Sequence, residues 1–108
     1  CMGPDVERLH RRGEGECAQL LLDFSDSRTA VVNVYTNTST PFAAALTTTE
    51  GTNYIAVDSS TIFRNTAAAM LDLFERGTAS VDRRETLAIH SALDAAKTEA
   101  ARSGFVDL

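Results

Sequence analysis

The sequence predicts an α+β fold in which an open, mostly antiparallel sheet carries two C-terminal helices packed on one face. Three observations support this class. Runs of β-branched, alternating residues fill most of the first half of the chain. Alanine-rich runs with helical spacing fill the second half. The order is therefore strands and then helices, without the βαβ rhythm of a parallel sheet.

The first half predicts two hairpins. A short alternating segment, Val6–Leu9, precedes turn-like residues 11–15. Residues 16–24 and 29–36 are stronger strand candidates, and the short polar segment 25–28 joins them as a hairpin loop. The second hairpin is expected from residues 42–48 and 52–57, with its turn at Glu50 and Gly51.

The second half predicts two helices and a short terminal strand. Asn65 or Thr66 caps the first helix, and Gly77 ends it, because the residue after a helix often adopts a left-handed conformation that favours glycine. Asp82 begins the second helix, three residues before Glu85 in the spacing of a capping box. This helix is expected to run from Arg83 to about Ser103, and residues 105–108 to return as a strand.

Alternation gives the two faces of the predicted sheet different chemistry. One face is apolar and is expected to lie under the helices: Ala18, Leu20, Leu22 and Phe24 beside Ala30, Val32 and Val34. The other face is semi-polar: Cys17, Gln19, Leu21 and Asp23 beside Val31, Asn33, Tyr35 and Asn37. Because such a face suits a protein contact better than a ligand, Leu21, Val31, Asn33 and Tyr35 are the candidate interface residues.

Length and charge exclude several classes of protein. The 108 residues are expected to form a single domain, residues 1–108, with no room for separate cofactor and substrate domains. The net charge of −5 makes nucleic acid a poor partner, and the pairs Arg11-Arg12 and Arg83-Arg84 are expected to lie in solvent among acidic neighbours. We expect no membrane contact, because no apolar stretch reaches about 20 residues, and a cytoplasmic location is the default.

The residues that carry chemistry are few. Cys1 and Cys17 lack the spacing of a zinc site or a disulfide scaffold; Cys17 is interpreted as a small core residue and Cys1 as adventitious. His10 lies in a charged strand or turn, and His90 lies in the middle of a helix, where a lone histidine is most often a surface or boundary residue. No catalytic, cofactor-binding or metal-binding residue is assigned.

Three carboxylates lie at strand ends: Asp23, Asp26 and Asp58. Loop carboxylates usually form turns. The alternative is a carboxylate in a sheet cavity, as in a small ligand-binding or isomerase-like domain, with Asp23 and Asp58 as its candidates.

A combination of segments resembles a known family. Residues 69–77 and 82–96 (…VDRRETLAIHSALDAA…) resemble the C-terminal end of the glucose–fructose oxidoreductase and inositol dehydrogenase family, Gfo/Idh/MocA. Residues 20–30 resemble its strand–turn–strand segment, with Ser27 where a glycine is usual. Residues 1–7 resemble the segment that follows the helix opening its C-terminal domain.

The resemblance implies a role for the chain. In that family a Rossmann domain binds NAD or NADP, and a C-terminal domain with an open antiparallel sheet supplies one wall of the substrate cleft and the oligomer contacts. The family's catalytic residues have no matching position here, so the chain alone is expected to be inactive and to hold no cofactor. Because it opens on Cys1 rather than on an initiator Met, we expect a piece of a longer oxidoreductase.

Two main hypotheses follow. In the first, the chain is the C-terminal substrate and oligomerisation domain of an NAD(P)-dependent oxidoreductase acting on a sugar, polyol or similar hydroxy compound, and it contacts the parent's Rossmann domain. In the second, it is a freestanding, dimeric sheet-and-helix interaction module without catalysis. Both predict a homodimer through the open sheet face.

Overall fold

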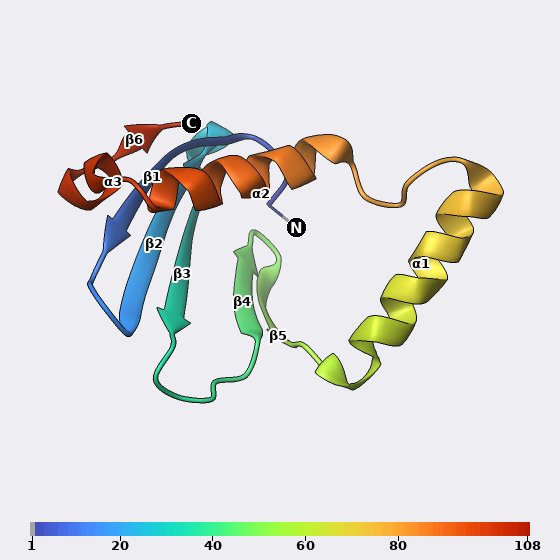
Figure 1. Ribbon diagram of the computed structural model, residues 1–108. Coiled ribbons are helices and arrows are strands. Elements are labelled where there is room, and N and C mark those ends of the chain that lie inside the picture. Colours follow the sequence, from blue (N-terminus) through green and yellow to red (C-terminus); the bar gives the residue numbers. More distant parts are fainter. Residues whose placement is uncertain (1) are drawn as a thin grey trace. The chain divides into compact units, whose positions relative to one another are not determined.

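The computed structural model describes residues 2–108, which form two compact units (Figure 1). The first unit contains the residues up to Thr38 together with Val81–Leu108, and the second contains Ser39–Ser80. Every strand pairing is antiparallel. With helices in both units, the predicted α+β class is confirmed.

The first unit is built on a four-stranded sheet with the order β3-β2-β1-β6. Its strands are β1 (Val6–Arg12), β2 (Cys17–Phe24), β3 (Thr29–Tyr35) and β6 (Val106–Asp107). A 3₁₀ turn, η1 (Ser25–Ser27), joins β2 to β3 where the hairpin loop was predicted. The turn predicted to begin at Arg11 is wrong, because β1 continues to Arg12 and pairs with β2 over that length.

Two helices lie on one face of this sheet, and Figure 1 shows α2 crossing it. They are α2 (Arg83–Ala96) and α3 (Glu99–Ser103). Asp82 caps α2 as predicted, since its carboxylate accepts from the backbone N–H of Arg84. The single helix predicted to reach Ser103 is wrong, because Thr98 ends one helix and starts the next. Its hydroxyl donates to the carbonyl of Ala95 at 2.7 Å and accepts from the N–H of Ala101 at 3.2 Å.

The core of the first unit forms between β1 and the two helices. Leu9 is completely buried against Ala96 and Ala101. Leu20, Leu22, Ala92 and Val106 pack around this centre. The face predicted to lie under the helices is therefore covered along β2. On β3 the same face stays about two-fifths exposed at Val32 and Val34, so the helices leave that strand largely uncovered.

Cys17 corrects a prediction. It is exposed rather than buried, because alternation along β2 turns Leu20, Leu22 and Phe24 toward the helices and Cys17 toward the opposite face. The apolar run that contains Cys17 belongs to two faces of a strand, and only one of them is core. Cys1 lies outside the described residues.

The second unit contains a hairpin followed by a helix. The hairpin consists of β4 (Ala43–Thr48) and β5 (Gly51–Ala56), close to the predicted bounds. A 3₁₀ turn, η2 (Ser59–Thr61), leads into α1 (Ile62–Arg76), which begins several residues before the predicted start. Gly77 ends α1 in the left-handed conformation, with φ of 71°, as predicted.

The helix α1 has no buried residue. Phe63, Met70 and Phe74 lie on one side of it, at the spacing of an amphipathic stripe, and all three are exposed. No helix formed by residues 2–108 combines the length and the apolar character that a membrane span needs.

Candidate functional site

The face of the first sheet that the helices leave open is the candidate site. Pairing between β2 and β3 places Leu21 opposite Val31, Gln19 opposite Asn33 and Cys17 opposite Tyr35. The four predicted interface residues therefore share one face. Pairing with β1 adds further residues to the same face, among them Arg8 opposite Asp23 and His10 opposite Leu21.

This open face combines exposed apolar and aromatic side chains with a polar pair that lies between them. Val31 is 56 % exposed and Tyr35 is 46 % exposed. Between them, the side-chain amide of Gln19 donates to the side-chain oxygen of Asn33 at 2.9 Å. A surface of exposed β-branched and aromatic residues with satisfied polar side chains is typical of a protein contact.

A polar cluster that the sequence analysis missed lies at the β1 side of the sheet. The Arg8 Nε donates to Asp23 at 2.6 Å, and the Arg8 guanidinium stands 4.5 Å from the centre of the Phe105 ring. The His10 and Phe105 ring centres are 5.4 Å apart. Alternation along β1 could have revealed this cluster, because it places Arg8 and His10 on the same face. The prediction missed it because it ended the strand at Leu9 and placed Arg11 in a turn.

His10 has a structural role. Its Nδ1 lies 2.7 Å from the carbonyl oxygen of Ala101 and 3.1 Å from that of Gly104. Since a carbonyl oxygen only accepts, Nδ1 carries the hydrogen and donates to both. The imidazole therefore provides a hydrogen-bond donor to carbonyl oxygens at the C-terminal end of α3. His90 lies exposed on α2 and makes no side-chain hydrogen bond with any residue of the 2–108 range.

The carboxylates do not form a buried site. Asp23 is held by Arg8, and Asp26 occupies the η1 turn with φ of 62°. Asp58 caps η2, and hydrogen bonds from Ser60 hold the pKa of Asp58 below its ordinary value. No charged side chain is buried within residues 2–108. The hypothesis of Asp23 or Asp58 as a buried carboxylate in a sheet cavity is therefore wrong.

A cleft of about 210 Å³ opens between α2 and the helix-side face of the sheet. It is lined mainly by apolar side chains, and Glu85 is its one charged lining residue. Ligand pockets usually combine a larger volume, about 300–1,000 Å³, with several converging polar groups. This cleft lacks both features.

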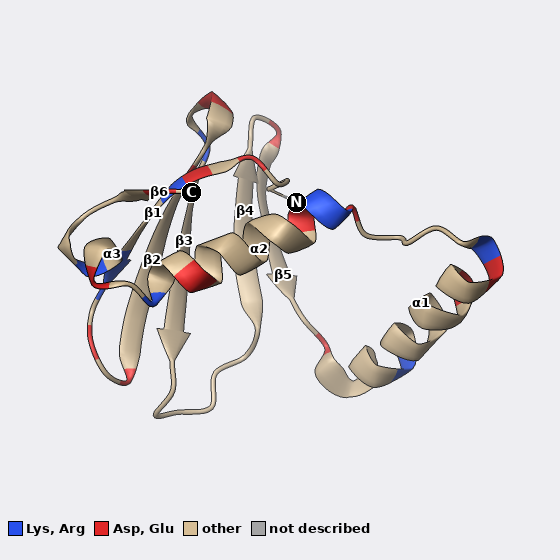
Figure 2. Cartoon of the chain, turned by 45° about the horizontal axis from the view of Figure 1, so that its top comes forward, with Lys and Arg blue, Asp and Glu red and all other residues tan. Residues whose placement is uncertain are grey.

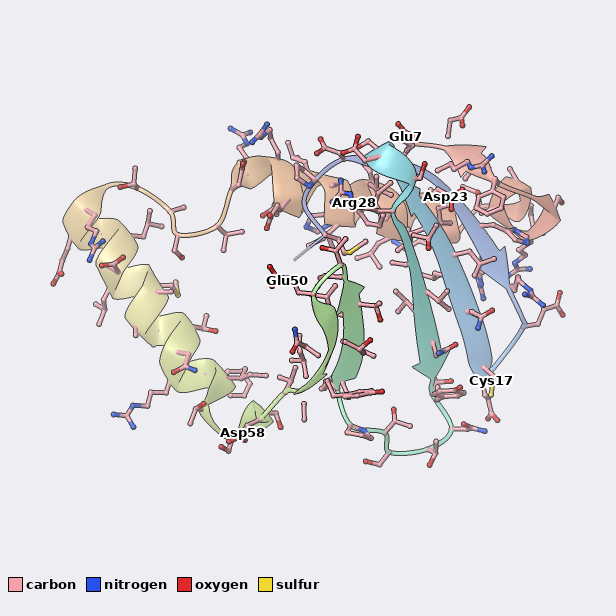
Figure 3. All side chains as sticks on the ribbon, turned by 180° about the vertical axis from the view of Figure 1, so that it is seen from behind. Glu7, Cys17, Asp23, Arg28, Glu50 and Asp58 are labelled. Carbon is pink, nitrogen blue, oxygen red and sulfur yellow. The ribbon has the colours of Figure 1, made fainter. Side chains whose placement is uncertain are left out.

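The charged side chains of residues 2–108 provide no metal site, since no group of three or more His, Cys, Asp or Glu side chains comes together there. Figure 3 shows Asp23 and Cys17 at opposite ends of β2. The exposed Val31 and Tyr35 side chains make the open face suited to contact with another protein surface.

Comparison with known proteins adds no relative. No protein-family model, no curated protein and no solved structure matches the chain.

Proposed function

We propose that the chain is an assembly domain that dimerises through its open sheet face. More specifically, we propose that it is the C-terminal substrate and oligomerisation domain of an NAD(P)-dependent oxidoreductase resembling the Gfo/Idh/MocA family. The observation that carries the first statement is the one-sided cover of the sheet: α2 and α3 lie on one face, and the other presents Val31 and Tyr35 to solvent.

Physical chemistry favours covering this face. Antiparallel sheets tolerate one face in water when that face is polar. Here Val31 and Tyr35 expose apolar surface, and Leu21 lies opposite Val31. Burying such surface contributes roughly 25 cal/mol per Å². A two-fold axis through the open face would bring the face onto its own copy, which is the geometry of an isologous dimer.

The exposed stripe of α1 also supports a role within a larger assembly. Phe63 is 87 % exposed and Phe74 is 76 % exposed, although aromatic side chains gain much from burial. A helix with no buried residue gains its stability only when its apolar side meets another surface. A wider protein contact would supply that surface.

The described residues do not fit a nicotinamide cofactor. All strand pairs are antiparallel, and no glycine-rich G-x-G-x-x-G turn joins a strand to a helix. The pyrophosphate of a dinucleotide needs that turn and the helix N-terminus behind it. In the proposed oxidoreductase, NAD or NADP is therefore held by a separate Rossmann domain. This chain supplies a wall of the substrate cleft.

The dimer is tested by replacing interface residues with lysine. Val31→Lys and Tyr35→Lys are expected to weaken dimerisation at least about 100-fold, because each buries an unpaired charge in the contact. Val34→Lys is the matched control, since Val34 lies on the same strand with its side chain on the opposite face. Light scattering that gives an unchanged dimer mass for Val31→Lys removes this face as the interface.

The oxidoreductase assignment is tested separately. Titration of the 108-residue chain with NADH is expected to show no binding, and tight binding would overturn the assignment. The coding sequence before Cys1 provides the second test. An in-frame segment with G-x-G-x-x-G after a predicted strand supports the oxidoreductase. Its absence favours the alternative, a freestanding dimeric sheet-and-helix module, which predicts the same effect of Val31→Lys.

A further inference from the structure

A second cleft, of about 260 Å³, lies where the β1–β2 turn meets α3. Arg12 belongs both to this cleft and to the open face, where it lies opposite Gln19 and near Asn33 and Tyr35. Its lining comes from the end of β1, the turn and α3: His10, Arg11, Arg12, Gly13, Glu14 and Arg102. Since β6 pairs with β1 only at Arg8 and Leu9, the rest of β1 is a sheet edge here. The cleft is therefore open at the edge of the sheet and bounded by α3.

The cleft is basic on an acidic chain. Three arginines, Arg11, Arg12 and Arg102, and one carboxylate residue, Glu14, line it. Arg11 lies on the helix side of β1 and Arg12 on the open face, and both line the cleft at the edge of the sheet. The whole chain has a formal net charge of −5. Figure 2 shows the Lys and Arg colour on β1 and on α3, two elements that contact each other. The cleft therefore carries a local excess of positive charge, although the chain as a whole is negatively charged.

The arginines of the cleft differ from most of the other basic residues. Arg8, Arg76, Arg84 and Lys97 each form a salt bridge with an aspartate. Within residues 2–108, neither Arg11 nor Arg12 has a carboxylate partner. Arg102 forms an ion pair with Glu99 at 3.1 Å, which positions it on α3. Arg11 and Arg12 therefore keep the capacity to bind an external anion.

The surrounding backbone holds this arrangement in place. Arg11 Nη1 donates to the carbonyl oxygen of Ala96 at 3.3 Å, so this guanidinium is oriented before any ligand arrives. His10 is fixed by its two carbonyl acceptors on Ala101 and Gly104. Gly13 has φ of 81°, and a Cβ there would lie 2.5 Å from the carbonyl oxygen of Cys17. The turn beside Arg12 therefore requires glycine.

We propose that this cleft binds the phosphoryl group of a small anionic ligand, with Arg12 and Arg11 as its main donors and Arg102 beside them. Guanidinium groups pair with phosphate oxygens through two parallel charge-assisted hydrogen bonds, which add both strength and geometric specificity. Glu14 opposes the anion and limits its affinity.

The test is a titration of the ¹⁵N-labelled chain with inorganic phosphate at constant ionic strength, followed by amide chemical shifts. Saturable shifts are expected at Arg12, Gly13 and Arg102. A hexose 6-phosphate, with the unphosphorylated hexose as its control, distinguishes the source of the group. Equal affinity for both phosphates indicates recognition of the phosphoryl group alone, whereas tighter binding of the sugar phosphate indicates that it is the ligand class.

Variants make the test specific. Arg12→Glu is expected to raise the dissociation constant for phosphate at least about tenfold, and Glu14→Gln to lower it. Arg83→Glu is the matched control, because it changes the net charge equally and Arg83 belongs to the other basic pair, exposed at the start of α2. Unchanged amide shifts elsewhere show that each variant is folded. Linear shifts without saturation, or an equal loss in Arg83→Glu and Arg12→Glu, overturn the proposal.

Discussion

The Nδ1 atom of His10 donates to the carbonyl oxygen of Ala101 at 2.7 Å, which ties β1 to α3 at the rim of the core. A second acceptor, the carbonyl oxygen of Gly104, lies 3.1 Å away. His10 thus links β1 to the C-terminal end of α3 through these two hydrogen bonds.

Replacing this histidine is expected to destabilise the first unit. His10→Ala leaves two carbonyl oxygens without their donor, which costs about 1–3 kcal/mol. His90→Ala is the control, since His90 is exposed, and we expect it to change the free energy of unfolding by less than about 0.5 kcal/mol. Urea unfolding measures both. Equal midpoints for the two variants would contradict a structural role for His10.

The position of the core predicts that a buried and an exposed leucine differ in their contribution to stability. Leu9 is completely buried against Ala96 and Ala101, so Leu9→Ala is expected to lower the free energy of unfolding by about 2–5 kcal/mol. Leu87 on α2 is more than half exposed, and Leu87→Ala is expected to cost under about 1 kcal/mol. If urea unfolding shows similar losses for the two leucines, the core is not centred on Leu9.

Much of this fold is predictable from local patterns. The alternation of residues 16–24 and 29–36 locates β2 and β3 within one residue at each end, and Gly77 marks the end of α1. These features depend on neighbouring residues only, so a sequence reveals them.

The errors arise where distant contacts decide the structure. Arg11 and Arg12 resemble a turn, yet they continue β1, because β2 pairs with them and the carbonyl of Ala96 accepts from Arg11. The break at Thr98 is decided by one hydroxyl that serves two helix ends. Likewise, the contact of Phe105 with Arg8 joins residues almost a full chain apart.

The cap of α2 predicts a pH dependence. Hydrogen bonds from the side chain and the backbone of Arg84 hold the pKa of Asp82 below its ordinary value. A carboxyl group with a lowered pKa stabilises the fold above its unfolded-state value, about 3.9, and loses that contribution as the pH falls through its folded value. The contribution of Asp82 is therefore complete at pH 6 and declines below about pH 4.

Asp82→Asn tests this prediction, because asparagine keeps an oxygen that caps the helix but removes the charge that pairs with Arg84. Asp82→Asn is expected to have a lower Tm than the unsubstituted chain at pH 6, with the difference shrinking toward pH 2. Asp26→Asn is the control, since Asp26 has no hydrogen-bond partner for its side chain within residues 2–108. A difference between Asp82→Asn and the unsubstituted chain that is constant with pH would contradict the assignment.

Cys17 provides a direct probe of the proposed interface. It is exposed and lies opposite Tyr35 on the open face, so its thiol is expected to react quickly with a thiol reagent in the monomer and more slowly in the dimer. The measurement uses a Cys1→Ser background and compares labelling rates at protein concentrations below and above the dimer dissociation constant. We expect at least an approximately tenfold slowing at high concentration, because a buried thiol reacts only when the contact opens.

The lysine variants separate protection by the interface from other causes. In Val31→Lys the labelling rate is expected to stay fast at every concentration, because the dimer no longer forms. In Val34→Lys it is expected to slow as in the unsubstituted chain, since that side chain lies on the opposite face of β3. Concentration-independent labelling in the unsubstituted chain, at concentrations where light scattering reports a dimer, would place the contact on another surface and leave the open face in solvent.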